Sequence, residues 1–321
     1  MIITVCMNPA VDKTVEIIRL MAGGLNRIKK VEYDAGGKGI NVSKTIRELG
    51  GKSIATGFLG GNTGKVVEAA LVEQKILCDF IHVDGETRTN TKVIEECGRV
   101  TELNEPGPVI RQEELQGLLN KLESYAGEDT LFILAGSVPK GIEPDIYEKI
   151  TALVHKKGAK VLLDADGELF RKALLAIPDM IKPNHVELEE FVGADLGTRE
   201  ALKEAARAFL QQGIDTVVIS LGEDGALFLW KDDEAEALPL PVQAHSTVGA
   251  GDAMVAAMAH AWENKLNREE TIRLCMAASA GAVTTMGTKP PKKEVVEELK
   301  TRVVIMEGRG NEQPFYPAGK N

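Results

Sequence analysis

Short apolar segments alternate with amphipathic ones along most of the chain. Runs rich in Val, Ile and Leu, each the length of a strand, occupy residues 2–7, 53–60, 130–136, 159–166 and 215–222. Between these runs, apolar positions recur with the spacing of a helix at residues 39–50, 111–127, 144–158 and 198–213. Strands that alternate with helices in this way predict an α/β fold, with a buried, mainly parallel sheet and helices on both of its faces.

Two stretches interrupt this alternation. Residues 13–20 lead toward residues 28–34, and residues 90–103 alternate around a Cys-Gly-Arg turn, as antiparallel ribbons do. Both stretches follow a core strand and return to the core, so we expect one small β-sheet that covers the strand ends like a lid. Ordinary surface hairpins are the alternative. The predicted organisation is an α/β core and a β lid. The core comprises residues 1–10, 34–85 and 106–321, and the lid comprises residues 11–33 and 86–105.

Composition narrows the classes of ligand. The chain has 321 residues, is 44% hydrophobic and carries a formal net charge of −10, with only 4% aromatic residues. Such a chain is a poor candidate for binding nucleic acid or an anionic membrane, so an anionic small molecule would need a local basic cluster. The chain opens directly on a strand, with no signal-peptide pattern, and it has no apolar run long enough to span a bilayer, so we expect a cytoplasmic protein.

Candidate ligand-binding residues follow the first strands. In parallel sheets, ligands bind at the carboxyl ends of the strands. Asp12, in NPAVD, can accept hydrogen bonds from sugar hydroxyls, although it also suits a turn. Lys38, in the glycine-rich stretch DAGGKGINVS, could reach a phosphate or a polyol together with the backbone, or could simply be solvated. Arg88, in ETRTN, could bind a phosphate bidentately from the lid.

Two further motifs suit a nucleotide. In IKPNHVELEE, Asn184 and Glu187 have the spacing of a capping box at the start of a helix. The functional alternative assigns Lys182 and Asn184 to nucleotide phosphates and Glu187 to the water shell of Mg²⁺. In SLGEDG, Gly222 and Gly225 would let the backbone approach a flat ring or a phosphate.

The stretch HSTVGAGDAMVAAMAHAW, residues 245–262, predicts a helix with a bare N-terminus. Gly249, Ala250 and Gly251 carry almost no side chain, so their N–H groups could contact an anion directly. Asp252 follows in the first turn, where an acidic residue is also an ordinary helix stabiliser. Together with the other candidates, Asp252 suits a base that removes the proton of an attacking hydroxyl while the N–H groups stabilise the transferred phosphoryl group.

These motifs resemble those of the ribokinase-like carbohydrate kinases, also called the PfkB family, over nearly the whole chain. GGKGINVS and TVGAGDAMVA are similar to the two family signatures, and NPAVD, ETRTN, GSVP, IKPNHVELEE and SLGEDG follow in the expected order. The resemblance implies a ribokinase-like three-layer α/β core with a small β-sheet lid that also serves as a dimer contact. Ala253, Ala257 and the DADG run at residues 164–167 depart from the commoner residues of the family, which bears on helix packing and nucleotide fit.

The resemblance also implies roles for individual residues. It makes Asp252 the catalytic base and assigns the anion hole to Gly249, Ala250 and Gly251. It assigns the phosphosugar to Asp12, Gly37, Lys38, Asn41, Arg88, Asn90 and Ser137, with Arg27 from the lid. It assigns ATP to Lys182, Asn184, Ser220, Gly222, Gly225, Thr247 and Val248, with Ser279 near the adenine. It leaves Glu187 for Mg²⁺, bound through water.

Within the family, the chain looks most like the phosphosugar branch. The implied reaction is ATP- and Mg²⁺-dependent phosphorylation of the 6-hydroxyl of fructose 1-phosphate, and the stretch ELNEPGP favours this acceptor. Tagatose 6-phosphate is the first alternative, because a ketofuranose carries a CH₂O group at each end. A non-catalytic phosphosugar-binding regulator is an alternative of another class, although the presence of Asp252 counts against it. We also expect a homodimer joined through the lid.

Overall fold

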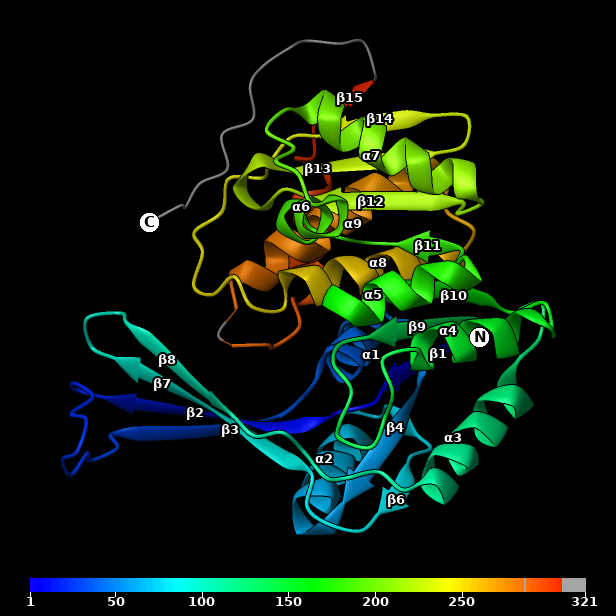
Figure 1. Cartoon of the computed structure of the whole chain (residues 1–321). Coiled ribbons are helices and arrows are strands. Elements are labelled where there is room, and N and C mark those ends of the chain that lie inside the picture. The colour runs from blue at the N-terminus through cyan, green and yellow to red at the C-terminus, as the bar shows by residue number, and fades with distance from the viewer. Residues whose placement is uncertain (286, 308–321) are drawn as a thin grey trace.

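The computed structural model of the chain describes residues 1–285 and 287–307, so residues 286 and 308–321 of the predicted core lie outside the described part. Most described strands belong to one large sheet (Figure 1). Its members are β1 (Ile2–Cys6), β4 (Ile54–Gly60), β5 (Leu77–Cys78), β6 (Ile81–Val83), β9 (Leu131–Ala135), β10 (Lys160–Asp164), β11 (Met180–Ile181), β12 (Thr216–Ser220), β13 (Ala226–Trp230), β14 (Glu234–Ala237) and β15 (Ile305–Glu307).

The order of the strands explains where the chain can bind a ligand. Among the described residues the large sheet has 11 strands in the order β15-β14-β13-β12-β11-β10-β9-β1-β4-β5, with β6 paired to β4. The strands from β12 to β5 run parallel, whereas β13, β14 and β15 form an antiparallel edge. Because parallel strands end at the same edge of a sheet, the loops after β1, β9, β10, β11 and β12 come together there.

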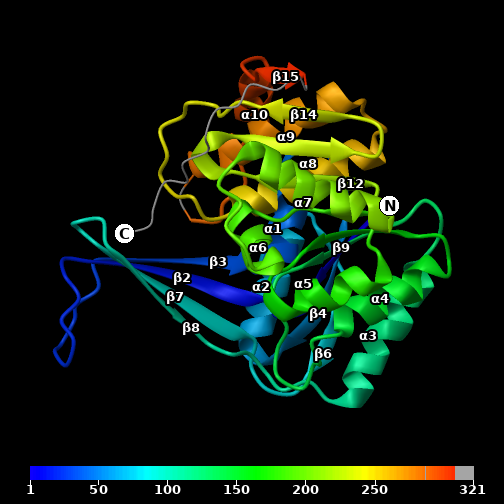
Figure 2. The same ribbon diagram turned by 45° about the horizontal axis from the view of Figure 1, so that its top comes forward.

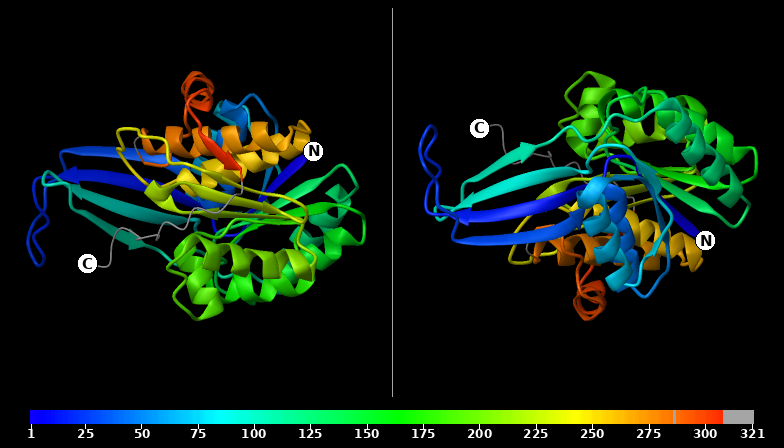
Figure 3. Two further views of the ribbon diagram at one scale, coloured as in Figure 1. Left: turned by 90° about the horizontal axis from the view of Figure 1, so that it is seen from above. Right: turned by 90° about the horizontal axis from the view of Figure 1, so that it is seen from below.

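Helices cover both faces of this sheet. Figure 3 shows the green helices on one side and the orange helices on the other, with strands between them. One apolar layer packs α3, α4, α5, α6 and α7 on the sheet, and the other packs α1, α8, α9 and α10. No helix of the described chain is long and apolar enough to cross a membrane. The helices are α1 (Lys38–Glu48), α2 (Gly61–Glu73), α3 (Gln112–Tyr125), α4 (Ile146–His155), α5 (Gly167–Ala173), α6 (His185–Val192), α7 (Arg199–Gln212), α8 (Ala250–Glu263), α9 (Arg268–Val283) and α10 (Lys293–Lys300).

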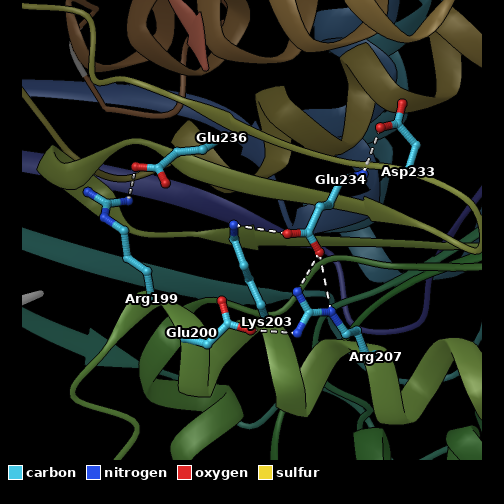
Figure 4. Close-up of polar contacts among 7 residues, drawn as sticks. All are labelled: Arg199, Glu200, Lys203, Arg207, Asp233, Glu234 and Glu236. Carbon is cyan, nitrogen blue, oxygen red and sulfur yellow. Dashed lines mark hydrogen bonds and ion pairs between the residues drawn. The ribbon is translucent and has the colours of Figure 1, made fainter. Parts of the chain in front are cut away.

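Charged residues fasten α7 to the antiparallel edge. Strand β14 alternates glutamate with alanine, so its alanines are buried on one face while its glutamates point toward α7 on the other. Glu234 pairs with Lys203 at 3.1 Å and with Arg207 at 2.7 Å, and Glu236 pairs with Arg199 at 2.7 Å (Figure 4). These ion pairs satisfy the charges where the sheet edge meets the helix, so the cluster is structural.

A second, smaller sheet projects from the core (Figures 1 and 2). Its strand order is β3-β2-β7-β8. Strands β2 and β3 form one antiparallel hairpin, β7 and β8 form another, and β2 joins the two hairpins by pairing in parallel with β7. The prediction of an α/β core with a small separate sheet is therefore confirmed. The strands are β2 (Ala10–Ile17), β3 (Lys30–Gly36), β7 (Arg88–Glu95) and β8 (Val100–Asn104).

The two faces of the small sheet differ in polarity. The register places Asp12 beside Asp34 and Asn90 on one face. A 2.8 Å ion pair between Lys44 of α1 and Asp34 connects this face to the core. Side chains alternate along a strand, so the positions between these fall on the opposite face. That face carries Val15, Val31, Tyr33, Val93 and Leu103, of which Val31, Tyr33 and Leu103 are 39%, 63% and 59% exposed.

Candidate active site

The N-terminus of α8 lies where the parallel strands end. Gly249, the residue before the helix, has a φ of 87°, a left-handed conformation that glycine adopts without strain. The first N–H groups of a helix have no partner within the helix and carry partial positive charge. A side chain on Gly251 would place its Cβ 3.4 Å from Nζ of Lys182, so this ammonium group lies beside the helix start. The arrangement suits an anion.

Asp252 is buried in the first turn of α8. Its side chain accepts a 2.8 Å hydrogen bond from Nδ2 of Asn41 on α1, and the residue is only 7% exposed. Burial raises the pKa of Asp252 to about 6, with a further increase from the negative charge of Asp164 and an opposing effect of the Asn41 hydrogen bond. A carboxylate with this pKa is ionised at neutral pH and basic enough to accept a proton from a substrate.

A buried carboxylate, Asp164, joins two of the predicted site residues. Its Oδ2 lies 3.4 Å from Nζ of Lys38, and its Oδ1 lies 3.3 Å from Nζ of Lys182. Burial alone would raise the pKa of Asp164, but the ammonium groups of Lys182 and Lys38 bring it below its ordinary value. The same contact raises the pKa of Lys38 and keeps this side chain charged. Lysines predicted to bind the phosphosugar and ATP therefore share one counter-charge.

Sequence reasoning assigned no role to Asp164. Its run, DADG, was noted only as a departure from the family pattern. The signal was available, because Asp164 directly follows the apolar residues Val161, Leu162 and Leu163 at the carboxyl end of a strand, the same kind of position that identified Asp12. Its contacts with two lysines from distant segments were not visible in the sequence.

On the small sheet, Asp12 and Asn90 lie side by side. Oδ1 of Asp12 accepts a 3.2 Å hydrogen bond from Nδ2 of Asn90, and burial raises the pKa of Asp12. A Cβ on Gly36 would lie 2.0 Å from Oδ2 of Asp12, so the glycine makes room for this carboxylate. The guanidinium of Arg88 donates to the carbonyl oxygens of Asn8 at 3.0 Å and Glu105 at 3.4 Å, which fixes it at the base of β7.

The segments predicted to bind a nucleotide lie after β11 and β12. Asn184 and Glu187 form the capping box of α6, with both hydrogen bonds at 2.8 Å. The helix-capping role that their spacing predicted is therefore present. Ser220 forms a parallel bridge with Asn184, which brings the two segments together. Gly222 and Gly225 both have positive φ, and a Cβ on Gly225 would lie 2.1 Å from a carbonyl oxygen of β14. The turn itself therefore requires Gly225.

The remaining predicted residues lie in different segments and differ in their exposure. Gly37 precedes α1 with a φ of 106°, and Ser137 is exposed just after β9. Thr247 and Val248 are exposed before α8, and Ser279 is partly buried on α9. The described residues hold no group of three or more acidic, His or Cys side chains that could bind a metal ion alone.

Arg27 does not lie near the other residues predicted to bind the phosphosugar. It is exposed in the connection between β2 and β3, at the end of the small sheet that projects farthest from the core (Figure 1). Strand β2 has 8 residues, and a strand of that length spans about 25 Å. Within one chain, Arg27 is therefore separated from the base of the small sheet by the length of β2.

An α/β core whose strand ends gather a buried carboxylate, two lysines and a glycine-rich helix start is the arrangement expected of a phosphoryl-transferring enzyme. A family model described as pfkB family carbohydrate kinase matches residues 1–294. The chain belongs to this family, as its motifs predicted, and is a phosphotransferase.

Individual relatives cover nearly the whole chain. The 1-phosphofructokinase of Xanthomonas campestris pv. campestris is 39% identical over 311 residues, which cover 94% of this chain and 97% of that protein. The 1-phosphofructokinase of Bacillus subtilis is 34% identical over 305 residues, covering 95% and 99% of the two chains. The crystal structure of phosphofructokinase-2 from Escherichia coli in complex with potassium has a TM-score of 0.89 at 27% identity, with 94% and 98% coverage.

Proposed function

We propose that the chain transfers the γ-phosphoryl group of ATP to the 6-hydroxyl of fructose 1-phosphate, giving fructose 1,6-bisphosphate and ADP. The observation that carries the proposal is Asp252, a buried carboxylate with a pKa of about 6 in the first turn of a helix whose start lies beside Lys182. The proposed acceptor is supported by two relatives named 1-phosphofructokinase that align with 94% and 95% of this chain.

In the proposed reaction, Asp252 takes the proton of the 6-hydroxyl as its oxygen attacks the γ-phosphorus. The new O–P bond forms as the bond from phosphorus to the leaving oxygen of ADP breaks. The backbone N–H groups of Gly249, Ala250 and Gly251, together with Lys182, stabilise the charge on the transferred group. Asn41 holds the carboxylate of Asp252 in place through its 2.8 Å hydrogen bond.

We assign the two substrates to opposite sides of this helix start. Lys38 and Arg88 bind the phosphate already present on the sugar. Asp12 and Asn90, which lie side by side, bind the sugar hydroxyls: Asp12 accepts hydrogen bonds from them and Asn90 donates hydrogen bonds to them. In this assignment the small sheet is the lid; its strands extend the predicted lid, residues 11–33 and 86–105, by Ala10 of β2 and by residues 34–36 of β3. The sugar also contacts Gly37, Asn41 and Ser137, and ATP contacts Lys182, Asn184, Ser220, Gly222, Gly225, Thr247, Val248 and Ser279.

Glu187 is the residue proposed to serve Mg²⁺. Its Oε2 accepts the capping hydrogen bond from the backbone of Asn184, which leaves Oε1 for a water molecule of the metal's hydration shell. When bound, the ion would neutralise charge on the β- and γ-phosphate oxygens. A carboxylate that reaches the metal through water agrees with the described residues, which offer no cluster of direct ligands.

The test is an ADP-release assay with fructose 1-phosphate, tagatose 6-phosphate and unphosphorylated fructose, applied to the parent chain and to Asp252→Asn. We expect fructose 1-phosphate to have the highest kcat/KM, and fructose to be far poorer because Lys38 and Arg88 lose their ligand. Asp252→Asn should lower kcat by about 10²–10⁴-fold, the usual contribution of a general base, while ATP still binds. Equal kcat/KM for fructose and fructose 1-phosphate, or near-normal turnover of the variant, would contradict the proposal.

We further propose that a second copy of the chain covers the apolar face of the small sheet, joining two chains about a two-fold axis. Support comes from Val31, Tyr33 and Leu103, which lie exposed on that face, since apolar side chains that gather on an exposed face mark an interaction surface. A structural neighbour is a tetrameric form of phosphofructokinase-2 from Escherichia coli.

Light scattering tests this assembly directly. We expect twice the 34.6 kDa mass of one chain at micromolar concentration. Tyr33→Asp should yield the single chain, because it buries a charge at the join. The control, Val66→Asp, changes a residue of α2 that is 55% exposed and should leave the mass unchanged. A fully active parent of single-chain mass would refute the proposed dimer.

We also propose a cytoplasmic location, where thiols stay reduced. Cys6, Cys78, Cys97 and Cys275 are all free, and disulfides are rare in that compartment. Fractionation of cells that express the chain without added targeting sequences tests this location. We expect recovery in the cytoplasmic fraction, and recovery in the membrane or secreted fraction would contradict the proposal.

A further inference from the structure

We infer that Asp164 is a positioning residue that holds Lys38 and Lys182 together, coupling the phosphosugar side of the site to the nucleotide side. The inference rests on the proposed function for the roles of the two lysines. It extends that function to a residue that needs no contact with either substrate. Asp164 is 2% exposed, so it acts through its neighbours.

The strand order explains how Asp164 reaches both lysines. It ends β10, which lies between β9 and β11. Lys182 follows β11, and its ammonium group lies beside Gly251 at the start of α8. Lys38 begins α1, and a Cβ on Gly136, just after β9, would lie 3.3 Å from the Cβ of Lys38. The carboxylate therefore stands on the middle strand, with one ammonium group on each side.

A shared counter-charge is what this arrangement requires. Lys182 and Asp164 are buried and Lys38 is partly exposed, and two ammonium groups that both lie within 3.4 Å of one carboxylate repel each other. Without the carboxylate, Lys38 and Lys182 would move apart. With it, both side chains are fixed before the substrates arrive, and the pKa of Lys38 is raised so that it stays charged. Such preorganisation matters for rate, because a displacement of about 1 Å can cost about 10²-fold.

A direct metal ligand is the other common role of a buried carboxylate, and the contacts of Asp164 argue against it. Each of its oxygens already faces an ammonium group. A cation placed there would be repelled by Lys38 and Lys182 together. The part of the chain that the structure describes also supplies no cluster of ligating side chains around it.

The kinetic test compares Asp164→Asn with Asp166→Asn, which removes an exposed carboxylate two residues later, between β10 and α5. We expect Asp164→Asn to lower kcat by about 10²-fold, because both lysines lose their fixed positions, and to raise KM for each substrate by a smaller factor. The acidic limb of kcat/KM should also move to lower pH, because the negative charge of Asp164 helps to raise the pKa of Asp252. A structural defect alone would lower activity without moving this limb.

Two results would overturn the inference. One is a kcat and an acidic limb equal to those of Asp166→Asn. The other is a loss of activity that higher Mg²⁺ concentrations restore, which would make Asp164 a metal ligand. If Asp164→Asn does not fold, Asp164→Glu keeps the charge and moves it by one methylene. We then expect a lower kcat with the acidic limb in place, and a parent-level kcat would refute positioning.

A readout without turnover separates this inference from the proposed function. Asp164 raises the pKa of Lys38, so Asp164→Asn should increase the labelling of Lys38 by an amine-reactive reagent at pH 8, as measured by peptide mass spectrometry. Asp166→Asn should increase labelling much less, because Asp166 makes only the smallest of the contributions that raise the pKa of Lys38. Increased labelling in a chain that phosphorylates none of the tested sugars would preserve the positioning role and refute the proposed function. Unchanged labelling in Asp164→Asn, with a parent that phosphorylates fructose 1-phosphate, would refute the positioning role and preserve the proposed function.

Discussion

Replacing Asn41 by alanine should move the pH dependence of the reaction, because Asn41 donates the hydrogen bond that favours the ionised form of Asp252. The donor and acceptor are 2.8 Å apart, and both residues are buried. A hydrogen bond to a charged group contributes about 1.5–3 kcal/mol, and 1.36 kcal/mol corresponds to one pKa unit. Its loss should therefore raise the pKa of Asp252 from about 6 by about 1–2 units.

The consequence at pH 7 can be calculated. With a pKa of about 6, about 90% of Asp252 is ionised, whereas about 10–50% is ionised in Asn41→Ala. We expect kcat/KM at pH 7 to fall about 2–10-fold for this reason and to recover by pH 9. Loss of a contact between Asn41 and the sugar would instead lower kcat/KM by the same factor at every pH. The full pH profile of kcat/KM therefore distinguishes the two effects.

Ser43→Ala is the matched control. Ser43 is buried on the same helix, but its hydroxyl shares hydrogen bonds of 2.7 and 2.9 Å with Thr4 and Ser53, away from Asp252. We expect this variant to be less stable, with the acidic limb of kcat/KM unchanged. An acidic limb that stays near pH 6 in Asn41→Ala would refute the reasoning, since the hydrogen bond would then not control the ionisation of the base.

Three further predictions concern stability and substrate binding. Because the pKa of Asp252 is raised from 3.8 to about 6, ionisation destabilises the folded chain by up to about 3 kcal/mol above pH 6. Asp252→Asn should therefore unfold at a higher Tm at pH 8, a gain that shrinks as the pH falls below 6 and disappears below about pH 3, where the parent is mostly protonated in both states. Gly36→Ala should raise KM for the phosphosugar and leave KM for ATP unchanged, because its Cβ would lie 2.0 Å from the Asp12 carboxylate; equal changes in both would contradict this. Gly225→Ala should lose about 2–4 kcal/mol in denaturant unfolding, whereas Gly127→Ala, where a Cβ meets nothing within 4 Å, should lose none.

The regular part of the fold was accessible from sequence because its signals are local. Strands such as β9 are unbroken apolar runs, and the amphipathic helices α3 and α7 follow the predicted segments within a few residues. The antiparallel edge was not predicted. In β14, the glutamates are paired with cations of α7, and such a partner, distant in sequence, cannot be read from the run EAEA alone.

The site was predictable where a motif marks a strand end or a helix start. Asp252, Lys38 and Lys182 are all found near the start of α8 or around Asp164. What the sequence could not supply is the contact between segments far apart in the chain, such as the hydrogen bond from Asn41 to Asp252, 211 residues later. The position of Arg27 could not be read from the sequence either, because it depends on the direction in which the small sheet projects from the core.

The parallel pairing of β2 with β7 has a consequence for how the chain folds. Asp12 and Asn90 face each other across this pair although 78 residues separate them, and β3, α1, β4 and α2 all lie between. The entropy of closing so long a loop must be offset before the pair gains any hydrogen bonds, so the intervening elements need to form first. We therefore expect the sugar-binding surface to assemble late during refolding, after the elements that it brackets in the sequence.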